Sequence, residues 1–262
     1  MNVSQLVSEE KVKKILDDFN VYEKSSKPNQ VNLDVKDLAA MIDHTLLKPE
    51  ATISEIKQLC EEAIQNNFTS VCVNPSFVST CFNIIKSSNV KVCTVIGFPL
   101  GATTTQSKFV EAEEAIKNGA EELDMVLNIG RLKDKDYDFV YYDLKSIADL
   151  SKKHLCTSKV ILENCLLSDE EKVAACILAK EAGLNFVKTS TGFSKSGATT
   201  HDVSLMKFVV GDKLKVKASG GIRSYEDAIA MINAGATRLG ASAGVKIIAG
   251  QKSESNYYWL LI

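Results

Sequence analysis

Several features that mark common protein classes are absent from this chain of 262 residues. Its seven cysteines include no C-x-x-C pair, and its three histidines form no H-E-x-x-H pair. These spacings indicate neither a disulfide framework nor a zinc site, so we expect a cytoplasmic protein with reduced cysteines. Apolar runs are too short for a membrane-spanning helix. The first segment, MNVSQLVSEEKVKKILDDF, contains acidic residues and no continuous apolar core, unlike a secretory signal.

An excess of one charge is also lacking. The chain has 31 basic and 33 acidic residues, and its net charge is −2. Because no basic stripe dominates, we do not expect nucleic acid as a partner. Hydrophobic residues make up 45% of the chain, which is enough to build a large core in one globular unit.

The clearest break in composition is the polar stretch EKSSKPNQ (23–30). It separates an N-terminal extension, residues 1–30, from residues 31–262, for which we predict a single catalytic domain. The extension is typical of an amphipathic helix. Its apolar stripe contains Leu6, Val7, Ile15, Leu16 and Phe19.

From about residue 34 onward, short apolar runs alternate with longer helical patterns. Strands are predicted near 41–46, 69–74, 91–97, 122–128, 158–164, 185–190, 214–219 and 236–240. Helices are predicted near 52–66, 76–87, 104–118, 138–153, 168–182, 200–210, 224–233 and 243–249. This alternation predicts a single (β/α)₈ TIM barrel with an extra N-terminal helix, and a doubly wound open sheet is the alternative.

A weak internal repeat supports the barrel. The segments NGAEELDMV (118–126), AGLNFVKTS (182–190) and AGATRLGAS (234–242) each contain a glycine, a short turn and then a strand. Aligning the glycines places Asp124, Lys188 and Gly240 at the same position, as expected for a repeated helix-to-strand unit.

Two of the predicted strands carry a lysine at their centre. NFVKTSTG (185–192) contains Lys188, and KVKASGG (215–221) contains Lys217. Residues two apart share a face, so both lysines and Asp124 would line the barrel interior if those faces point inward. Like charge and desolvation favour the neutral amine, which can form a Schiff base with a carbonyl compound. The alternative is that each lysine reaches solvent at a strand end or pairs with an acid.

Glycine-bearing loops follow the sixth, seventh and eighth predicted strands. Such loops in barrels often bind phosphate through exposed backbone N–H groups. The residues that fit this role are Gly192, Gly220, Gly221, Gly240, Ala241 and Ser242. Ser242 could instead cap the last helix, and Lys195 and Arg223 could add charge or simply be solvated. No nucleotide-binding glycine motif occurs, so a small phosphorylated carbonyl compound is the favoured ligand.

Six segments of the chain, which include both lysine-bearing strands, resemble the deoxyribose-phosphate aldolase family. The matching motifs are IDHTLLKP (42–49), VCVNPSFV (71–78), VIGFPLGATTTQSKFVEAEEAIKNGAEELDMVLNIG (95–130), FVKTSTGF (186–193), VKASGGIR (216–223) and RLGASAG (238–244). The resemblance implies a class I aldolase, a carbon–carbon lyase that uses no metal and no cofactor. Its reaction would be the reversible cleavage of 2-deoxy-D-ribose 5-phosphate to acetaldehyde and D-glyceraldehyde 3-phosphate, in the breakdown of deoxynucleosides.

The same resemblance assigns roles to particular residues. Lys188 would form the Schiff base, Lys217 would promote loss of its proton, and Asp124 would donate and accept protons. Asp43 and Cys72 would lie near the substrate, while strand alternation turns the neighbouring His44 away and leaves it structural.

Other expectations follow from where the chain departs from the family. The family often ends in a mobile tyrosine that reaches the site, a role that Tyr257 or Tyr258 could take here.

We also expect a homo-oligomer, specifically a dimer. The alternatives are another Schiff-base aldolase and a barrel that binds a sugar phosphate without chemistry.

Overall fold

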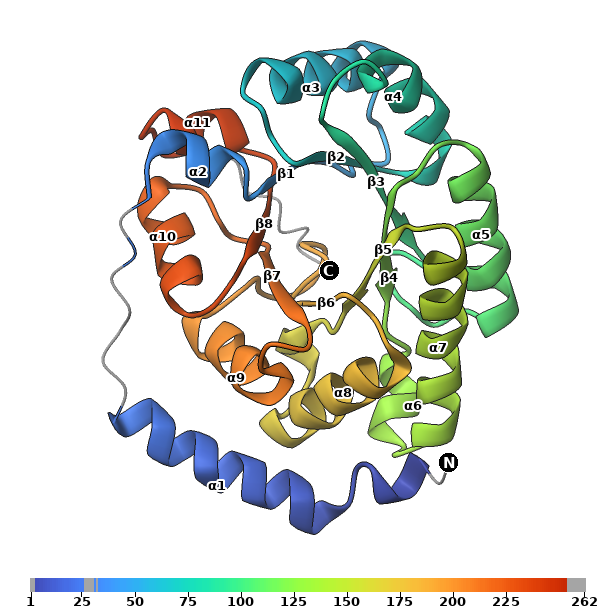
Figure 1. Cartoon of the computed structure of the whole chain (residues 1–262), viewed down its shortest axis with the longest axis vertical. Helices are drawn as coiled ribbons and strands as arrows, with labels where there is room; N and C mark the ends of the chain where they lie inside the picture. Colours follow the sequence, from blue (N-terminus) through green and yellow to red (C-terminus); the bar gives the residue numbers. More distant parts are fainter. Residues whose placement is uncertain (1–2, 26–30, 32, 254–262) are drawn as a thin grey trace.

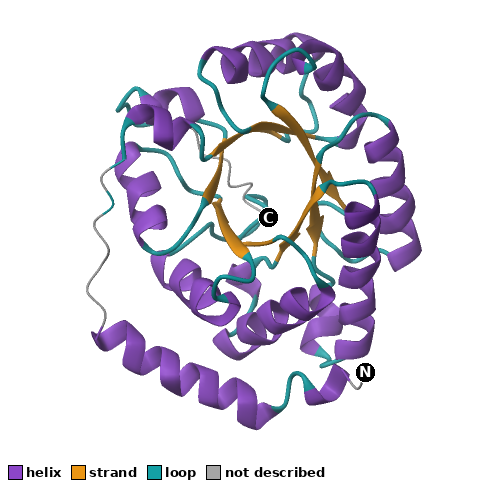
Figure 2. Ribbon diagram, viewed as in Figure 1, coloured by secondary structure: helices purple, strands orange, loops and turns teal. Residues whose placement is uncertain are grey.

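A closed barrel of parallel strands forms the centre of the computed structural model, which describes residues 3–25, 31 and 33–253 (Figures 1 and 2). Each strand pairs with the next in sequence, and β1 closes the barrel against β8. The strands are β1 (Ile42–Leu46), β2 (Ser70–Val73), β3 (Lys91–Ile96), β4 (Glu122–Val126), β5 (Thr157–Ile161), β6 (Phe186–Lys188), β7 (Lys215–Ser219) and β8 (Arg238–Ala241). The predicted (β/α)₈ barrel is therefore confirmed, and the open sheet is excluded.

Helices surround the barrel and cover its outer face (Figure 2). The long ones are α1 (Glu9–Ser25), α3 (Ile53–Gln65), α4 (Val78–Ile85), α5 (Thr105–Lys117), α7 (Tyr137–Lys153), α8 (Asp169–Ala182), α9 (Thr200–Val210) and α10 (Tyr225–Asn233). Shorter helices are α2 (Val35–Ala39), α6 (Ile129–Lys133), α11 (Gly244–Ile248) and the 3₁₀ helices η1 (Val3–Gln5), η2 (Pro75–Phe77) and η3 (Asn164–Leu166).

Local signals explain where several helices begin. Thr52 and Ser168 form capping boxes with Glu55 and Glu171. Each hydroxyl accepts a hydrogen bond from the backbone N–H of the glutamate three residues later, and the glutamate side chain accepts one from the backbone N–H of the capping residue. Gly183 ends α8 in the left-handed conformation, with φ of 85°, which glycine adopts without strain.

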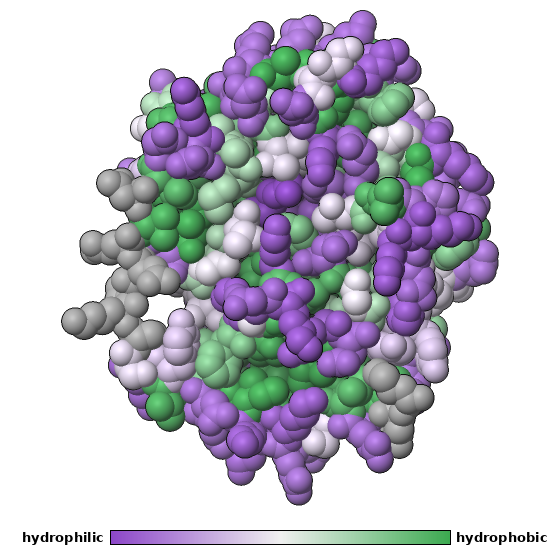
Figure 3. All heavy atoms as spheres, in the orientation of Figure 1, coloured by the Kyte–Doolittle hydropathy of each residue, from purple (hydrophilic) through white to green (hydrophobic). Residues whose placement is uncertain are grey.

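The N-terminal helix α1 lies outside the barrel, alongside α8 and α9 (Figure 1). Val12 and Phe19 are buried residues of α1 itself. The centroid of the Phe19 ring lies 5.5 Å from that of Phe208 and 5.6 Å from that of His201. In Figure 3 the edge where α1 lies is hydrophilic, while apolar residues gather over α8. The helix thus packs its apolar stripe against the barrel's own helices.

Strand register determines which side chains meet inside the barrel. Lys188 is the direct partner of Lys217, Asp124 of Lys159, and Asp43 of Gly240. Because neighbouring strands lie about 4.8 Å apart, residues in register on the inner face contact one another. This register brings the predicted lysines together.

Candidate active site

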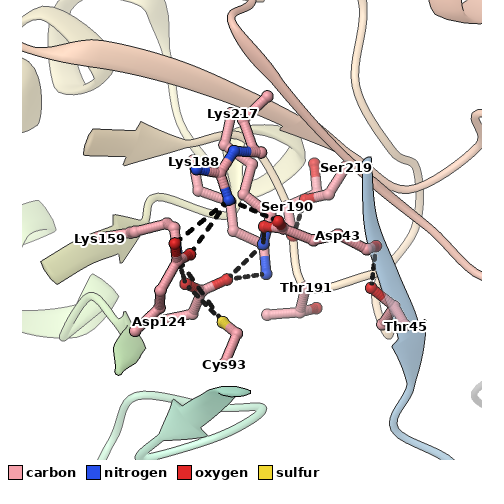
Figure 4. A network of polar contacts seen from close by, with 12 residues as sticks. Asp43, Thr45, Cys93, Asp124, Lys159, Lys188, Ser190, Thr191, Lys217 and Ser219 are labelled. Carbon is pink, nitrogen blue, oxygen red and sulfur yellow. Dashed lines mark hydrogen bonds and ion pairs between the residues drawn. The ribbon is translucent and has the colours of Figure 1, made fainter. Parts of the chain in front are cut away.

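Asp124 is the centre of a buried network of charged side chains (Figure 4). Its Oδ2 accepts hydrogen bonds from Lys188 Nζ at 2.8 Å and from Lys217 Nζ at 2.7 Å. Its Oδ1 accepts from Lys159 Nζ at 2.7 Å, and the Cys93 thiol lies 3.3 Å from the same atom. One carboxylate therefore holds three ammonium groups within the barrel.

A second carboxylate layer surrounds this centre. Asp43 Oδ2 lies 2.5 Å from Lys217 Nζ, and its Oδ1 accepts from Arg238 at 2.6 Å. Glu122 Oε2 lies 2.5 Å from Lys159 Nζ and 3.2 Å from Arg238. Four cationic side chains thus face three carboxylates, so Asp43, Asp124 and Glu122 do not balance every positive charge when all the groups are ionised.

Burial and charge act in opposite directions on these groups. Burial alone would raise the pKa of Asp124, but the ammonium groups of Lys159, Lys188 and Lys217 hold that pKa well below its ordinary value. Burial alone would lower the pKa of Lys217, yet Asp124 and Asp43 raise it above the ordinary lysine value. Lys217 is therefore a permanent cation at neutral pH.

A pocket lies next to the network, and residues from the loops after β6, β7 and β8 line it. Lys188 is the one member of the charged network that lines it. The other lining residues are Thr45, Leu47, Thr191, Gly192, Phe193, Ser219, Gly220, Gly221, Ile222, Arg223, Gly240, Ala241, Ser242 and Ala243. The pocket therefore joins a reactive amine to a wall rich in glycine.

Every residue predicted for phosphate binding lines this pocket. Gly220 and Gly221 have φ values of 82° and 80°, a backbone conformation that favours glycine and exposes consecutive N–H groups. Ser242 does not cap α11, because the N-cap of that helix is Ala243 without a side-chain bond. Lys195 is exposed and is not among the lining residues, whereas Arg223 is.

Close packing explains two of these glycines. A Cβ atom on Gly240 would lie 3.1 Å from Lys217 Cε and 3.0 Å from Ser219 Cβ. A Cβ atom on Gly197 would lie 2.1 Å from the carbonyl oxygen of Gly220. Glycine at 240 therefore leaves room for the lysine side chain, and glycine at 197 allows two loops to touch.

Asp43 and Cys72, both expected near the substrate, do not line the pocket and have different surroundings. Asp43 belongs to the charged network, and the Ser70 hydroxyl also donates to its Oδ1 at 2.7 Å. Cys72 is buried opposite Cys93 in register, in a small apolar cluster, and is not among the pocket-lining residues. His44 points outward as predicted, where its Nε2 lies 2.7 Å from Glu62 Oε2.

Sequence reasoning missed three members of the network: Lys159, Glu122 and Arg238. Glu122 and Arg238 are the first residues of β4 and β8, where a charged residue is usually solvated, whereas Lys159 is the central residue of β5. The available signal was the same as for Lys188, since Lys159 also interrupts an apolar strand, TSKVI. Tyr257 and Tyr258 lie outside the described residues.

Two sets of buried ligand groups could in principle hold a metal ion. The ligand atoms of Cys72, Cys93 and Asp124 lie within 4.8 Å of one another, as do those of Asp43, Cys93 and Glu122. The Lys159 ammonium already lies between these groups, 2.7 Å from Asp124 and 3.6 Å from the Cys93 sulfur. A protein cation therefore neutralises the acids at the place that an ion would take.

Among the helices that the structure describes, none combines the length and apolar character needed to cross a bilayer.

The fold and the site together define an aldolase of the lysine-dependent barrel class. Residues 38–250 match the family model described as DeoC/LacD family aldolase. The chain therefore belongs to the DeoC/LacD aldolase family.

Individual relatives agree with this assignment. The chain is 57% identical over 225 residues to a deoxyribose-phosphate aldolase from Clostridium perfringens, covering 86% of this chain and 100% of the relative. It is 59% identical over 218 residues to one from Caldanaerobacter subterraneus, covering 83% and 94%. Among solved structures, the tetrameric deoxyribose phosphate aldolase from Aeropyrum pernix superposes with a TM-score of 0.77 at 33% identity, covering 90% and 96%.

Proposed function

We propose that this chain catalyses the reversible cleavage of 2-deoxy-D-ribose 5-phosphate to acetaldehyde and D-glyceraldehyde 3-phosphate, through a Schiff base on Lys188. The observation that carries the proposal is that Lys188 alone among the network residues reaches the glycine-lined pocket. The relatives that share most of the chain have the same activity in their names. The physiological role that follows is deoxynucleoside breakdown.

The chemistry begins at the amine of Lys188. Its neutral form attacks C1 of the open-chain sugar, and loss of water with uptake of one proton gives a protonated imine. Asp124 then takes the proton of the C3 hydroxyl, through a water, as the C2–C3 bond breaks. The electron pair of that bond moves into the imine and forms an enamine, while D-glyceraldehyde 3-phosphate leaves. Protonation of the enamine carbon and hydrolysis release acetaldehyde and restore the amine.

The other network residues prepare this step. Lys217 shares Asp124 Oδ2 with Lys188, so the two lysine side chains bind the same carboxylate oxygen. Asp43 holds Lys217 in place at 2.5 Å. The N–H groups near Gly220, Gly221, Gly240 and Ser242, together with Gly192 on the facing loop, would bind the phosphate.

Borohydride trapping tests the proposal. The protein is incubated with acetaldehyde and borohydride, digested, and analysed by peptide mass spectrometry. We expect a two-carbon adduct on Lys188. An adduct on Lys217 would exchange the roles of the two lysines. Folded protein that binds the sugar phosphate but forms no adduct would support a binding protein without chemistry.

Three further features belong to this proposal. We infer a homodimer, a cytoplasmic location, and a division of the chain into a 1–30 extension and a 31–262 catalytic domain. The free state of all seven cysteines supports the location, and the family match at 38–250 supports the division. Analytical ultracentrifugation of the full chain tests the oligomer, and a monomer or tetramer would contradict a dimer.

A further inference from the structure

Glu163 is a buried acid next to the pocket that the proposed chemistry does not use. It lies two residues after the end of β5, and only 2% of its surface is exposed. Its backbone has φ of 57° and ψ of 60°, in the left-handed region that residues other than glycine rarely adopt. Conformations of this kind persist where the surrounding structure fixes them, often at functional sites.

The backbone around Glu163 is held against the end of β6. Leu162 N donates to Lys188 O at 2.9 Å, and Asn164 N donates to Thr189 O at 3.0 Å. These two bonds lie on either side of Glu163, so the residue is fixed beside the segment that follows the proposed Schiff-base lysine.

The carboxylate of Glu163 is bonded to Thr191. Its two oxygens accept from Thr191 N at 3.4 and 3.3 Å, and its Oε2 also accepts the Thr191 hydroxyl proton. Burial raises the pKa of Glu163, and the bonds from Thr191 oppose that rise. The Cys165 thiol lies 3.8 Å from Oε1. The partners of the carboxylate in these bonds are therefore a hydroxyl, a backbone amide and a thiol, and the charge of Lys188 also acts to lower its pKa.

These bonds determine the polarity of the Thr191 hydroxyl. A threonine hydroxyl has one proton to donate and two lone pairs that accept. Glu163 takes the proton, and Phe193 N occupies one lone pair at 3.0 Å. Thr191 lines the pocket, three residues after Lys188 on the same wall. The Thr191 hydroxyl therefore has no proton left to donate to a ligand, but its remaining lone pair can accept a hydrogen bond from one.

We propose that Glu163 is a positioning residue that fixes the Thr191 hydroxyl as an acceptor and so selects substrates with a hydroxyl on the carbon next to the cleaved bond. This inference rests on the proposed function. Asp124 serves the C3 hydroxyl, so the group that Thr191 accepts from is the C4 hydroxyl, between the reacting carbons and the phosphate. In the synthetic direction this is the C2 hydroxyl of D-glyceraldehyde 3-phosphate.

The test compares two acceptors with acetaldehyde as the donor. They are D-glyceraldehyde 3-phosphate and 3-oxopropyl phosphate, which differ by that one hydroxyl. For wild-type protein, kcat/KM should favour the hydroxylated acceptor. Glu163→Gln keeps the shape, imitates the protonated acid and can donate to Thr191, so the preference should fall about tenfold. Thr191→Val should cause the same loss, and Thr191→Ser should retain the preference.

A double-mutant cycle separates positioning from general damage. If Glu163 acts through Thr191, the variant with both Glu163→Gln and Thr191→Val should lose no more preference than either single variant. Glu113→Gln, at an exposed glutamate paired with Lys117, is the matched control and should leave the preference unchanged. If Glu163→Gln does not fold, Glu163→Asn takes its place, because asparagine tolerates the left-handed backbone.

Trapping of acetaldehyde on Lys188 is measured in every variant, because that half-reaction does not involve Thr191. It should stay within about twofold of wild type. A preference unchanged in the Glu163 variant, or losses that multiply in the double variant, would overturn the inference. Absence of any adduct in wild-type protein would instead overturn the proposed function.

Discussion

Lys188 and Lys217 are direct register partners on β6 and β7, and both donate to the same oxygen atom, Oδ2 of Asp124. The two lysines nevertheless differ in their surroundings. Lys217 has a second carboxylate, Asp43, at 2.5 Å, whereas Lys188 lines the pocket. This difference supports the proposal that Lys188, and not Lys217, is the reacting amine.

Replacing Lys217 should harm both stability and activity. Lys217→Met leaves Asp43 and Asp124 with fewer cations in a buried site, and breaking such a pair typically costs about 3–5 kcal/mol. Activity should fall by about a hundredfold or more, because the proton-transfer geometry is lost. Urea unfolding and steady-state kinetics measure the two effects. Lys215→Met, at an exposed position of the same strand, should change stability by less than about 0.5 kcal/mol.

Adding one methyl group at position 240 should disturb the same lysine. The Cβ atom of Gly240→Ala would lie 3.1 Å from Lys217 Cε, so the side chain must shift. We expect kcat to fall about 10- to 100-fold with a stability loss of about 1–3 kcal/mol. The control is Gly130→Ala in α6, where the nearest atom would be 3.9 Å away. Equal effects of the two substitutions would show that Lys217 is not the cause.

The lowered pKa of Asp124 predicts how the free energy of unfolding depends on pH. Because its folded pKa lies below the unfolded value of about 3.9, its contribution is complete above that pH and is lost as the pH falls through the folded pKa. The difference in unfolding free energy between wild type and Asp124→Asn should therefore be constant from pH 7 to about 4, and shrink below it. Urea unfolding across this range measures the difference. A decline that is already present between pH 7 and 5 would contradict the assignment.

His201 predicts how α1 responds to pH. Its Nδ1 lies 2.8 Å from Glu23 of α1 and its Nε2 lies 3.1 Å from Asp169, which Lys172 also contacts. Partial burial lowers the pKa of His201, but the two acids raise it above its ordinary value. The stabilisation is thus complete below the unfolded pKa of about 6.5 and is lost as pH rises through the folded one.

The effect at His201 should be small, about 0.2–1 kcal/mol, because the side chains are partly exposed. Hydrogen-exchange protection factors of α1 amides should be higher at pH 6 than at pH 8.5. His201→Gln serves as the control and should remove this pH dependence. If the protection of α1 amides in the wild-type protein does not change with pH, the contact between His201 and Glu23 does not stabilise the packing of α1.

The barrel could be predicted because its signals are local. Buried parallel strands appear as short apolar runs, and caps such as Thr52 and Ser168 mark where helices begin. Helices α2 and α6, each of five residues, were missed, whereas the equally short α11 was predicted near 243–249. Strand β6 ends at Lys188, earlier than predicted, since the chain turns from the ladder into the loop that carries Thr191 and Gly192.

The site could be predicted only in part, for a physical reason. Lys188, Lys217 and Asp124 are charged residues within apolar strands, so each one stands out alone. Glu122 and Arg238 stand at the starts of strands that are not neighbours, and only the closed barrel brings them to within 3.2 Å of each other. Glu163 could not be found at all, because its importance comes from a left-handed backbone and from contact with another loop.

The excess of one cation over the carboxylates around Asp124 bears on the reaction intermediates. A protonated lysine and a protonated imine both carry one positive charge, so the Asp124 carboxylate that contacts Lys188 would also suit the imine proposed to form on it. The surroundings need little reorganisation between those two states. The neutral forms of that nitrogen, the attacking amine and the enamine, leave the three remaining cations matched by three acids. On the proposed mechanism, the charges of the network therefore balance in the neutral stages and leave one excess positive charge in the protonated stages.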